Sequence, residues 1–407
     1  MRFFRSSYLT NELLKMKRKK HTPERLPFQV DHAEINLRIK QKTISAITVD
    51  TTVFDDNGMR LDRGLFSQLL QFGRHPANLV ISEVVLKEIT RHLTGSINIK
   101  KERLGRDMID AADFVGFDLK YVQEIKDKFR ELPASSDLCE AQINTFLDVS
   151  GTIVVEATDH IDVSDVLKCY FDAAAPFHHE NPKKKEFPDA IALLSLEAWA
   201  MDEETEVVVV SRDSDWETFC DGSERLHLVK DLANALAMFQ TPDEAVKNLV
   251  ENLRSTLNNP KSDLFLAIEN EIREFDWASH ATSDIESQFQ CEEDDSYVEI
   301  KKIVFVDRPD AIAVTEIDEE AVSVTFALQI AGEYTGDFSF QKWDSVDREY
   351  ISMGGGSVEQ DFNVSVAVVL RIPNKSTDPE DIEWDIEPLP LHFYLGELEP
   401  DWMSGHD

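Results

Sequence analysis

The stretch EVVVV at residues 206–210 places the strongest constraint on how this chain can fold. An unbroken run of apolar, β-branched residues is typical of a strand buried on both faces, as in a parallel sheet. Other apolar runs of strand length are ISAITVD (44–50), NLVIS (78–82) and RLHLV (225–229), with TIVVEA (152–157) as a short strand or a helix turn. Helical patterns separate these runs, at residues 83–93, 100–148, 187–204 and 230–239. The alternation predicts an α/β domain at 43–240, a parallel sheet with helices on both faces.

The C-terminal part of the chain has a different periodicity. From about residue 290, apolar and polar residues alternate, as in AVSVTFALQI (321–330). Such alternation is typical of antiparallel strands with one buried face, and GGG (354–356) and NKSTDPED (374–381) are turn signals. We therefore expect an antiparallel β domain at 290–407, joined to the α/β domain by a helical connector at 241–289.

Charge is distributed unevenly along the 407 residues, which carry a formal net charge of −36. Residues 1–42 contain 11 Lys and Arg against 4 Asp and Glu and form a basic N-terminal segment, whereas residues 290–407 contain 7 against 28. An acidic protein repels nucleic acid at long range unless a local basic surface overcomes its field. A nucleic-acid-binding function would therefore require such a surface.

Cysteine usage and hydropathy indicate a cytoplasmic protein. The four cysteines are scattered and form neither a CxxC pair nor a zinc-type spacing, so a disulfide framework is not expected. No apolar run approaches the roughly 20 residues of a membrane-spanning helix. The N-terminus is basic but lacks the unbroken apolar core of a secretory signal. We therefore expect a cytoplasmic location and no membrane partner.

Acidic residues follow the predicted strands of the α/β domain. Asp50 ends the first strand, and Asp213 and Asp215 follow EVVVV. Glu88 lies in the helix after the second strand, and Asp189 begins the helix that leads into EVVVV. Ligands of open parallel sheets bind outside the carboxyl ends of the strands. These five acids are therefore expected to meet at one edge of the sheet.

Carboxylates that meet in this way need a cation. Two like charges about 4 Å apart repel by about 1 kcal/mol in water, and by more at a lower effective dielectric. Oxygen ligands suit the hard cations Mg²⁺ and Mn²⁺, which retain waters and bind phosphates. The chemistry that fits such a site is phosphodiester hydrolysis by a metal-activated water.

Each acid also has a structural explanation. Asp50 can be a turn residue, and Asp213 or Asp215 can cap the helix SDWETF. Glu88 can be a solvated helix residue. Glu83 in the same helix is an alternative for its role, although a position near a helix N-terminus suits Glu83 without any metal. A shared cation is the hypothesis that accounts for the acids as a set.

The order of these motifs resembles a PIN domain over residues 43–240. The matching stretches are VDTT (49–52), SEVVLKE (82–88), EFPDAIAL (186–193), VVVVSRDSDW (207–216) and LHLVKDLANAL (226–236). The likeness is closest to a bacterial PIN-like branch with a K-x-E-F-P-D-A signature. It implies a metal-dependent nuclease, most simply an endoribonuclease, that uses one or two Mg²⁺ or Mn²⁺ ions. The implied metal ligands are Asp50, Glu88, Asp189 and Asp213, with Asp215 as an auxiliary catalytic residue.

The resemblance also implies how cleavage proceeds. No side-chain nucleophile is used, and the products carry 5′-phosphate and 3′-hydroxyl ends. Thr52 stands where many PIN domains carry Asn, and its hydroxyl can still hydrogen-bond a neighbouring carboxylate. Ser211 is expected to hydrogen-bond within the acid cluster rather than to act as a nucleophile. The implied substrate is single-stranded or structured RNA, with DNA as an alternative.

Two basic runs are candidates for contact with substrate phosphate. Lys183, Lys184 and Lys185 directly precede the helix of Asp189, and IKKERLGR (99–106) is a weaker candidate. Both runs can also be solvated surface charge. Reversal of the lysine charges would weaken RNA binding and its salt dependence if they contact phosphate.

A second hypothesis keeps the PIN fold without efficient cleavage. On this view the acidic β domain at 290–407 engages a regulatory protein partner or holds the nuclease site in an autoinhibited state. The simpler explanation is that this domain is a solubilising or oligomerising appendage, so a homo-oligomer is also an expectation.

Overall fold

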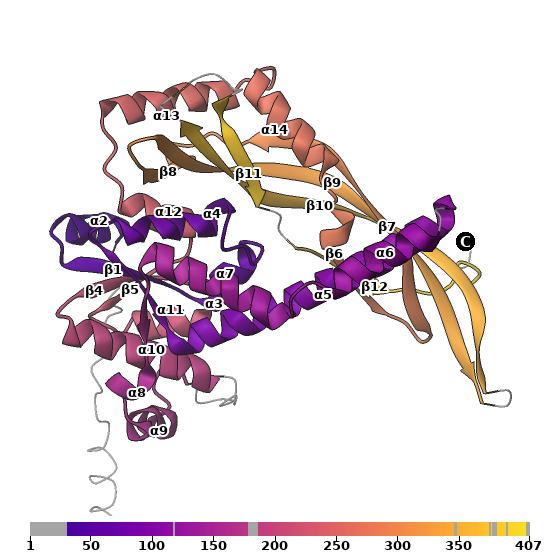
Figure 1. The fold of residues 1–407 in the computed structure, drawn as a ribbon, viewed down its shortest axis with the longest axis horizontal. Helices are drawn as coiled ribbons and strands as arrows, with labels where there is room; N and C mark the ends of the chain where they lie inside the picture. Colours follow the sequence, from indigo (N-terminus) through magenta and orange to yellow (C-terminus); the bar gives the residue numbers. More distant parts are fainter. Residues whose placement is uncertain are drawn as a thin grey trace, which may run out of the picture.

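The computed structural model describes residues 31–116, 119–177, 186–345, 348–373, 376, 381–387 and 390–403. Within these ranges an α/β domain is followed by a β-rich domain, as Figure 1 shows. Of the basic N-terminal segment expected at 1–42, the described part begins at Asp31 and forms helix α2 (His32–Lys40). Because α2 packs against β1 (Ile44–Val49), it belongs to the α/β domain rather than to a separate segment.

A five-stranded parallel sheet forms the centre of the α/β domain, as the apolar runs predict. Its strands are β1, β2 (Asn78–Ser82), β3 (Ile153–Val155), β4 (Glu206–Val210) and β5 (Leu226–Val229), in the order β3-β2-β1-β4-β5. All four pairings between them are parallel. Every residue of β4 is buried, which explains why this strand shows no polar alternation.

Helices cover both faces of this sheet. The helices of the domain are α2, α3 (Thr51–Asp56), α4 (Gly64–Ser67), η1 (Gln68–Gly73), α5 (Glu83–Val115), α6 (Leu119–Arg130), α7 (Ser135–Ser150), α8 (Ala157–His160), α9 (Val163–Asp172), α10 (Glu186–Asp202), α11 (Ser214–Cys220) and α12 (Leu232–Met238). Helix α10 packs against β2, β3 and β4, whereas α12 packs against β4 and β5. Figure 1 places α10 and α12 on opposite sides of the sheet.

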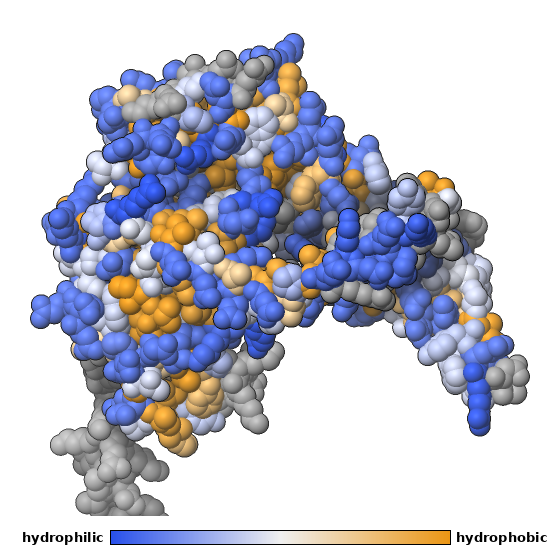
Figure 2. All heavy atoms as spheres, viewed as in Figure 1, coloured by the Kyte–Doolittle hydropathy of each residue, from blue (hydrophilic) through white to orange (hydrophobic). Residues whose placement is uncertain are grey.

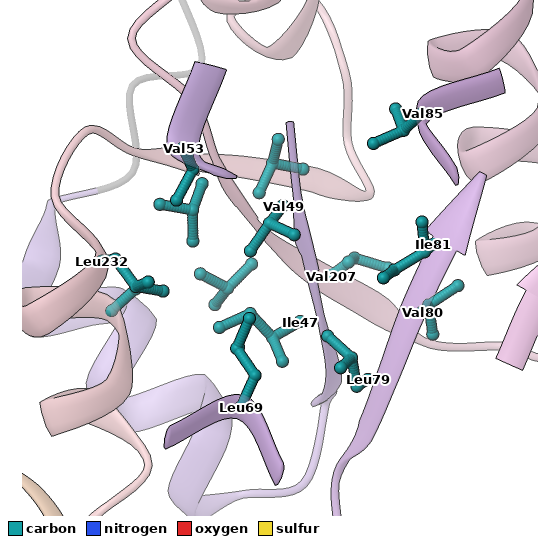
Figure 3. Packing of buried hydrophobic residues seen from close by; sticks show 14 of the residues in the cluster. Ile47, Val49, Val53, Leu69, Leu79, Val80, Ile81, Val85, Val207 and Leu232 are labelled. Atoms are coloured by element: carbon teal, nitrogen blue, oxygen red, sulfur yellow. The ribbon is translucent and has the colours of Figure 1, made fainter. Parts of the chain in front are cut away.

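The apolar core lies between the sheet and these helices. Ile47 and Val49 of β1 and Val207 of β4 are fully buried. Figure 3 shows Leu69 and Leu232 packed close to these strand residues. Complete burial of a Val, Leu or Ile side chain contributes about 1.5–3 kcal/mol. Burial of this apolar core therefore stabilises the fold and offsets the repulsion among the carboxylates at the sheet edge.

Helix α5 is 33 residues long and continues well beyond the helix expected at 83–93. Part of it projects away from the sheet, where α6 packs against it (Figure 1). Figure 2 shows mainly hydrophilic side chains over this projection. No helix in the described part of the chain is both long enough and apolar enough to cross a membrane.

An antiparallel sheet forms the centre of the C-terminal domain, as predicted. It contains β7 (Gln290–Phe305), β8 (Ile312–Ile317), β9 (Ala321–Asp344), β10 (Glu349–Pro373) and β11 (Glu383–Glu387). The order is β11-β10-β9-β7, and β8 also pairs with β9. The turn expected at 354–356 is wrong, because these glycines lie inside β10 beside a register shift. The strand accommodates them as a bulge, and the β9–β10 hairpin turns instead between Asp344 and Glu349.

The helical connector expected at 241–289 differs from what the structure contains. Its helices, α13 (Glu244–Leu257) and α14 (Asp263–Glu274), share a buried apolar cluster with β9 and β10 and so belong to the C-terminal domain. After the short helix η2 (Ala278–His280), residues of the expected connector form strand β6 (Ala281–Glu286). This strand pairs in parallel with β12 (Leu391–Glu397), which sequence periodicity alone does not predict.

The two domains pack directly against each other. Helix α12 and η1 contact β8, and α4 contacts β11. Val369 of β10 is buried within the apolar cluster of the α/β domain. Glu387 of β11 is 3% exposed; it accepts a hydrogen bond from the Leu65 N–H at 2.5 Å and pairs with Arg60 at 3.1 Å. The buried side chain of Val369 and the ion pair between Glu387 and Arg60 therefore join the β domain to the α/β domain.

Candidate active site

Asp50 lies at the carboxyl end of β1 and is almost fully buried, with 4% exposure. It is the N-cap of α3, and its Oδ1 accepts a hydrogen bond from the Thr51 N–H at 2.6 Å. Its Oδ2 accepts two more, from Thr52 Oγ1 at 2.6 Å and from Ser211 Oγ at 2.9 Å. Asp50 thus has the structural role of a helix cap, and the same hydrogen bonds hold its carboxylate at the sheet edge.

Asp213 follows β4, the strand next to β1, and caps α11. Its Oδ1 accepts a hydrogen bond from the Asp215 N–H at 2.6 Å, which places Asp215 in the first turn of this helix. The Asp213 N–H donates to Ser211 Oγ at 3.0 Å. Ser211 is fully buried and, as expected, hydrogen-bonds within the acid cluster, because it links the backbone of Asp213 to the carboxylate of Asp50.

Asp189 reaches the same edge from the first turn of α10, where the helix dipole favours a carboxylate. Its Oδ1 accepts a hydrogen bond from the indole Nε1–H of Trp216 at 3.0 Å, and Trp216 is 1% exposed. Burial raises the pKa of Asp189 to about 6, although the hydrogen bond from Trp216 opposes this shift. The pKa of Asp189 is raised further by three neighbouring carboxylates: Asp50, Asp213 and Glu88.

Glu88 and Glu83 occupy different environments on α5. Glu88 Oε2 accepts a hydrogen bond from Thr51 Oγ1 at 3.0 Å, next to Asp50 in the chain. Glu83 Oε1 instead accepts from the N–H of Ala157, at the start of α8, at 3.0 Å, and its Oε2 pairs with Lys87. The hydrogen bond from Lys87 is the main cause of the lowered pKa of Glu83. The geometry therefore favours Glu88 as the member of the acid cluster.

The electrostatics of Asp50 resemble those of Asp189. Burial raises the pKa of Asp50, the hydrogen bonds from Thr52, Ser211 and the backbone lower it, and the charge of Asp213 raises it again. Both carboxyls are therefore harder to ionise than a free aspartic acid, because each is partly desolvated and faces other acids. The ends of β1 and β4 and helices α5 and α10 thus bring four acids into one electrostatic cluster.

The donor chemistry of this cluster fits a hard divalent cation. Within the described ranges, no three His, Cys, Asp or Glu side chains converge closely enough to hold a metal ion through protein ligands alone. Mg²⁺, however, commonly retains several waters and uses only one or two carboxylates. The cluster offers oxygen donors, and a divalent charge would neutralise the repulsion that raises the pKa of Asp189.

Two partners of the acids were not among the sequence candidates. Trp216 directly follows Asp215 in SRDSDW. A buried indole N–H usually has a hydrogen-bond acceptor, so a tryptophan beside these acids was the sequence signal for a contact with a carboxylate. Thr51 lies beside Asp50 in VDTT, but its contact with Glu88 depends on how α3 and α5 pack. Sequence spacing could not reveal that second contact.

The basic candidates have different positions. Lys183 to Lys185 lie outside the described residues. In the second basic run, Lys101 Nζ donates to the carbonyl oxygen of Pro133 at 2.9 Å, which gives this lysine a structural partner. Lys100 and Arg103 are exposed on α5.

Fold and site together define the class: an α/β protein whose parallel sheet carries a cluster of acids at the carboxyl ends of its strands. Residues 47–216 match the family model described as a PIN domain, and this part of the chain is a PIN domain. The matched range contains all four acids of the cluster. No curated protein and no solved structure matched the chain.

PIN domains are typically nucleases that use divalent metal ions and bind nucleic acids, mainly RNA. A nuclease-type function is therefore supported at the level of the family. The matched range ends at Trp216 and does not include the C-terminal β domain. The family accounts for the acid cluster, whereas the β domain needs a separate explanation.

Proposed function

We propose that this protein is a metal-dependent phosphodiesterase, and specifically an endoribonuclease. The observation that carries the proposal is the environment of Asp189, whose pKa is raised to about 6, first by burial and then by three other carboxylates. A bound divalent cation would relieve this repulsion at the sheet edge. The family match supports the same reaction class.

In this proposal, four carboxylates hold one or two Mg²⁺ or Mn²⁺ ions: Asp50, Glu88, Asp189 and Asp213, with Asp215 as an auxiliary. A bound divalent ion would supply an acidified water and neutralise charge on the phosphate. Thr52 and Ser211 support catalysis by orienting Asp50 through their hydroxyl groups. Trp216 orients Asp189 in the same way.

The same contacts argue against a side-chain nucleophile. The Ser211 hydroxyl donates to Asp50 and accepts from the Asp213 N–H, so it is already engaged on both sides. Ser211 is also fully buried, which denies a substrate access to its oxygen. Attack by water, with 5′-phosphate and 3′-hydroxyl products, is therefore the mechanism that we propose.

The decisive experiment compares full-length Asp189→Asn and Asp50→Asn with wild type. With Mn²⁺ and single-stranded RNA, we expect each change to reduce cleavage by about 10³-fold or more, while far-UV circular dichroism stays unchanged. Asp202→Asn is the matched control, because Asp202 lies at the other end of α10 and is 66% exposed. If the two variants cleave RNA as wild type does, the proposed site is wrong.

Substrate contact by Lys183, Lys184 and Lys185 is a separate part of the proposal. Their sequence position directly before α10 supports it, as does the need for local positive charge in an acidic protein. Changing all three to Glu should weaken RNA binding and flatten its salt dependence. Reversal of Lys301, Lys302 and Lys342 in the β domain makes the same charge change and should have a much smaller effect. Equal effects of the two triple variants would indicate a long-range field and no direct contact.

A second candidate function, autoinhibition or partner binding by the β domain, is favoured by the contacts between the domains. A pocket of about 360 Å³ lies between the two domains beside these contacts, and it is lined by Arg212 and Asp56 of the PIN domain together with Ser365 of β10. Arg212 lies between Ser211 and Asp213 in the chain and pairs with Asp56 at 3.0 Å. A partner that moves the β domain would therefore change the surroundings of a segment of the acid cluster.

Variants of the full chain test this second function better than truncation does. A chain ending at residue 285 would remove β12, the partner of β6, and the strands whose core includes α13 and α14. Glu387→Gln loosens the interdomain contact without removing any element, and Glu383→Gln, at the exposed first residue of β11, is its control. Autoinhibition predicts faster RNA cleavage by Glu387→Gln alone. Unchanged cleavage supports an appendage.

A further inference from the structure

Helices α3 and α5 meet through two successive polar contacts. Thr51 Oγ1 of α3 donates to Glu88 of α5 at 3.0 Å. One turn further along both helices, Asp55 of α3 meets His92 of α5, whose Nδ1 lies 3.0 Å from both carboxylate oxygens. Residues four apart lie on the same helix face, about 6 Å from each other. His92 therefore sits one turn beyond Glu88 on the face that carries the candidate site.

Arg91 contacts the ring of His92. Arg91 is exposed, and its guanidinium Nη2 lies 3.3 Å from His92 Nε2. Because a guanidinium can only donate, Nε2 accepts this hydrogen bond, and Nδ1–H of the same ring donates to the Asp55 carboxylate. Asp55 and His92, whose side chains are 37% and 33% exposed, therefore hold the Arg91 guanidinium at the surface. In a chain with a net charge of −36, such a guanidinium beside an acid cluster is a local attraction for phosphate.

Gly95 lies one further turn along α5, seven residues after Glu88. A glycine inside a helix costs about 1 kcal/mol relative to alanine, so it usually answers a need for space. Here a Cβ would meet no described atom within 4 Å. No packing contact in the described part of the chain accounts for this residue, whereas close approach by another molecule would.

We propose that Arg91 binds the phosphate backbone of single-stranded RNA where it leaves the acid cluster, and that Gly95 lets this backbone approach α5 closely. His92 and Asp55 are positioning residues, because Asp55 holds His92 and His92 holds the Arg91 guanidinium. This inference rests on the proposed nuclease function, since it extends the substrate path from Glu88. The RNA would then run from the acid cluster along the first turns of α5, in the direction from Glu88 to Gly95.

Binding to RNA without cleavage tests this surface. The protein is full-length Asp189→Asn in EDTA, and the probe is a fluorescein-labelled oligouridine of about 16 nucleotides. Arg91→Ala should raise the Kd by about tenfold and reduce the salt slope by about 0.7, the value for one phosphate contact on a single strand. His92→Leu should raise the Kd by about fivefold, because the Arg91 guanidinium then loses the acceptor that holds it at the surface. Lys261→Ala is the matched control: it removes one exposed positive charge as well, but from the turn between α13 and α14 of the C-terminal domain.

Gly95 and Asp55 allow sharper tests than the loss of a charge. Gly95→Ala should raise the melting temperature by about 2–4 °C, because alanine favours the helix, and yet weaken RNA binding by about fivefold. In the cleaving protein, Asp55→Asn should raise KM by about threefold and leave kcat unchanged, since it acts through binding. A structural defect would lower the melting temperature in both variants and would reduce kcat with it.

The outcomes separate this proposal from the nuclease proposal. If Arg91→Ala and Lys261→Ala weaken binding equally, or if neither does, the RNA does not follow this face and the proposal is overturned. It is also overturned if Gly95→Ala binds RNA as well as its parent does. Cleavage by wild type with Mn²⁺ decides the nuclease proposal independently of all these binding measurements.

Discussion

Two carboxylates, the half-buried Asp189 in the PIN domain and the buried Glu387 at the interdomain contact, show how neighbours determine what a desolvated acid does. Burial is the largest cause of a raised pKa at both positions. At Glu387 the Leu65 N–H and the Arg60 guanidinium oppose the shift. At Asp189 the nearby acids reinforce it, and the Trp216 hydrogen bond opposes it. The comparison shows that neighbouring charges distinguish the two acids better than burial does: Glu387 is paired with donors and stabilises the domain contact, whereas Asp189 lies among other acids and is suited to bind a cation.

The largest expected effect on stability lies on the Glu387 side of the comparison. Glu387→Ala leaves the Leu65 N–H without its acceptor and removes one of the three acceptors of the partly buried Arg60 guanidinium, which should reduce the free energy of unfolding by about 2–3 kcal/mol. Urea titration of the full chain measures this loss. Glu383→Ala, exposed on the same strand, should change stability by less than about 0.5 kcal/mol. An equally small loss at Glu387 would show that the contact adds no stability.

Gly64 offers an independent route to the same contact. It has a φ of +67°, and a Cβ at this position would lie 1.9 Å from Glu387 Oε1. Gly64→Ala should therefore lower stability by about 2–3 kcal/mol, from backbone strain and from displacement of the carboxylate. Combining it with Glu387→Ala should recover part of the loss, because the clash is then absent. Full additivity in the double variant would contradict this explanation.

Trp216 is the one described hydrogen-bond donor to Asp189. Removal of its indole N–H should therefore increase the contrast between Asp189, which would lose its donor, and Glu387, which keeps its donors. Trp216→Phe keeps an aromatic ring but removes the Nε1–H, which should cost about 2 kcal/mol of stability. The pKa of Asp189 should rise above about 6, and a higher Mn²⁺ concentration should then be needed for cleavage at pH 6. Titration of activity against Mn²⁺ at pH 6 and pH 8 measures this shift. Identical Mn²⁺ requirements for variant and wild type would show that the indole does not support Asp189.

The acid cluster should destabilise the metal-free protein in a pH-dependent way. The pKa of Asp189 is raised to about 6, so the folded state binds more protons than the unfolded state between about pH 4 and pH 6. The free energy of unfolding in EDTA should therefore fall as pH rises through this window and then level off. Asp189→Asn should reduce this slope, with a remainder from Asp50 and Glu387, and should gain about 1 kcal/mol at pH 7, because solvent screens part of the repulsion. Urea titrations at pH 4, 5, 6 and 7 provide the comparison, and a slope unchanged by Asp189→Asn would contradict it.

Much of this protein follows from local patterns. The buried strand β4, the parallel sheet and the C-terminal antiparallel sheet follow from apolar periodicity, which reflects how many faces of each strand are buried. The positions of Asp50 and Asp213 after their strands follow from the same periodicity. The order of strands and helices added Asp189 and Glu88 to the set, and the family resemblance assigned them the role of metal ligands. The bulge at 354–356 and the parallel pair β6–β12 did not follow, because strand pairing over long sequence distances leaves no local signal.

What the sequence determined by itself is the set of strands and the acids at their ends, because strand burial and strand boundaries are local properties of the chain. Only the tertiary structure decided which acids share a site. Glu83 and Glu88 lie on one helix, five residues apart, yet Glu83 caps α8 and Glu88 faces Asp189. Likewise, nothing near Glu387 in the chain marks it as the partner of Leu65 and Arg60. Electrostatic neighbours are set by packing between distant segments, so their effect on an acid appears only once the chain has folded.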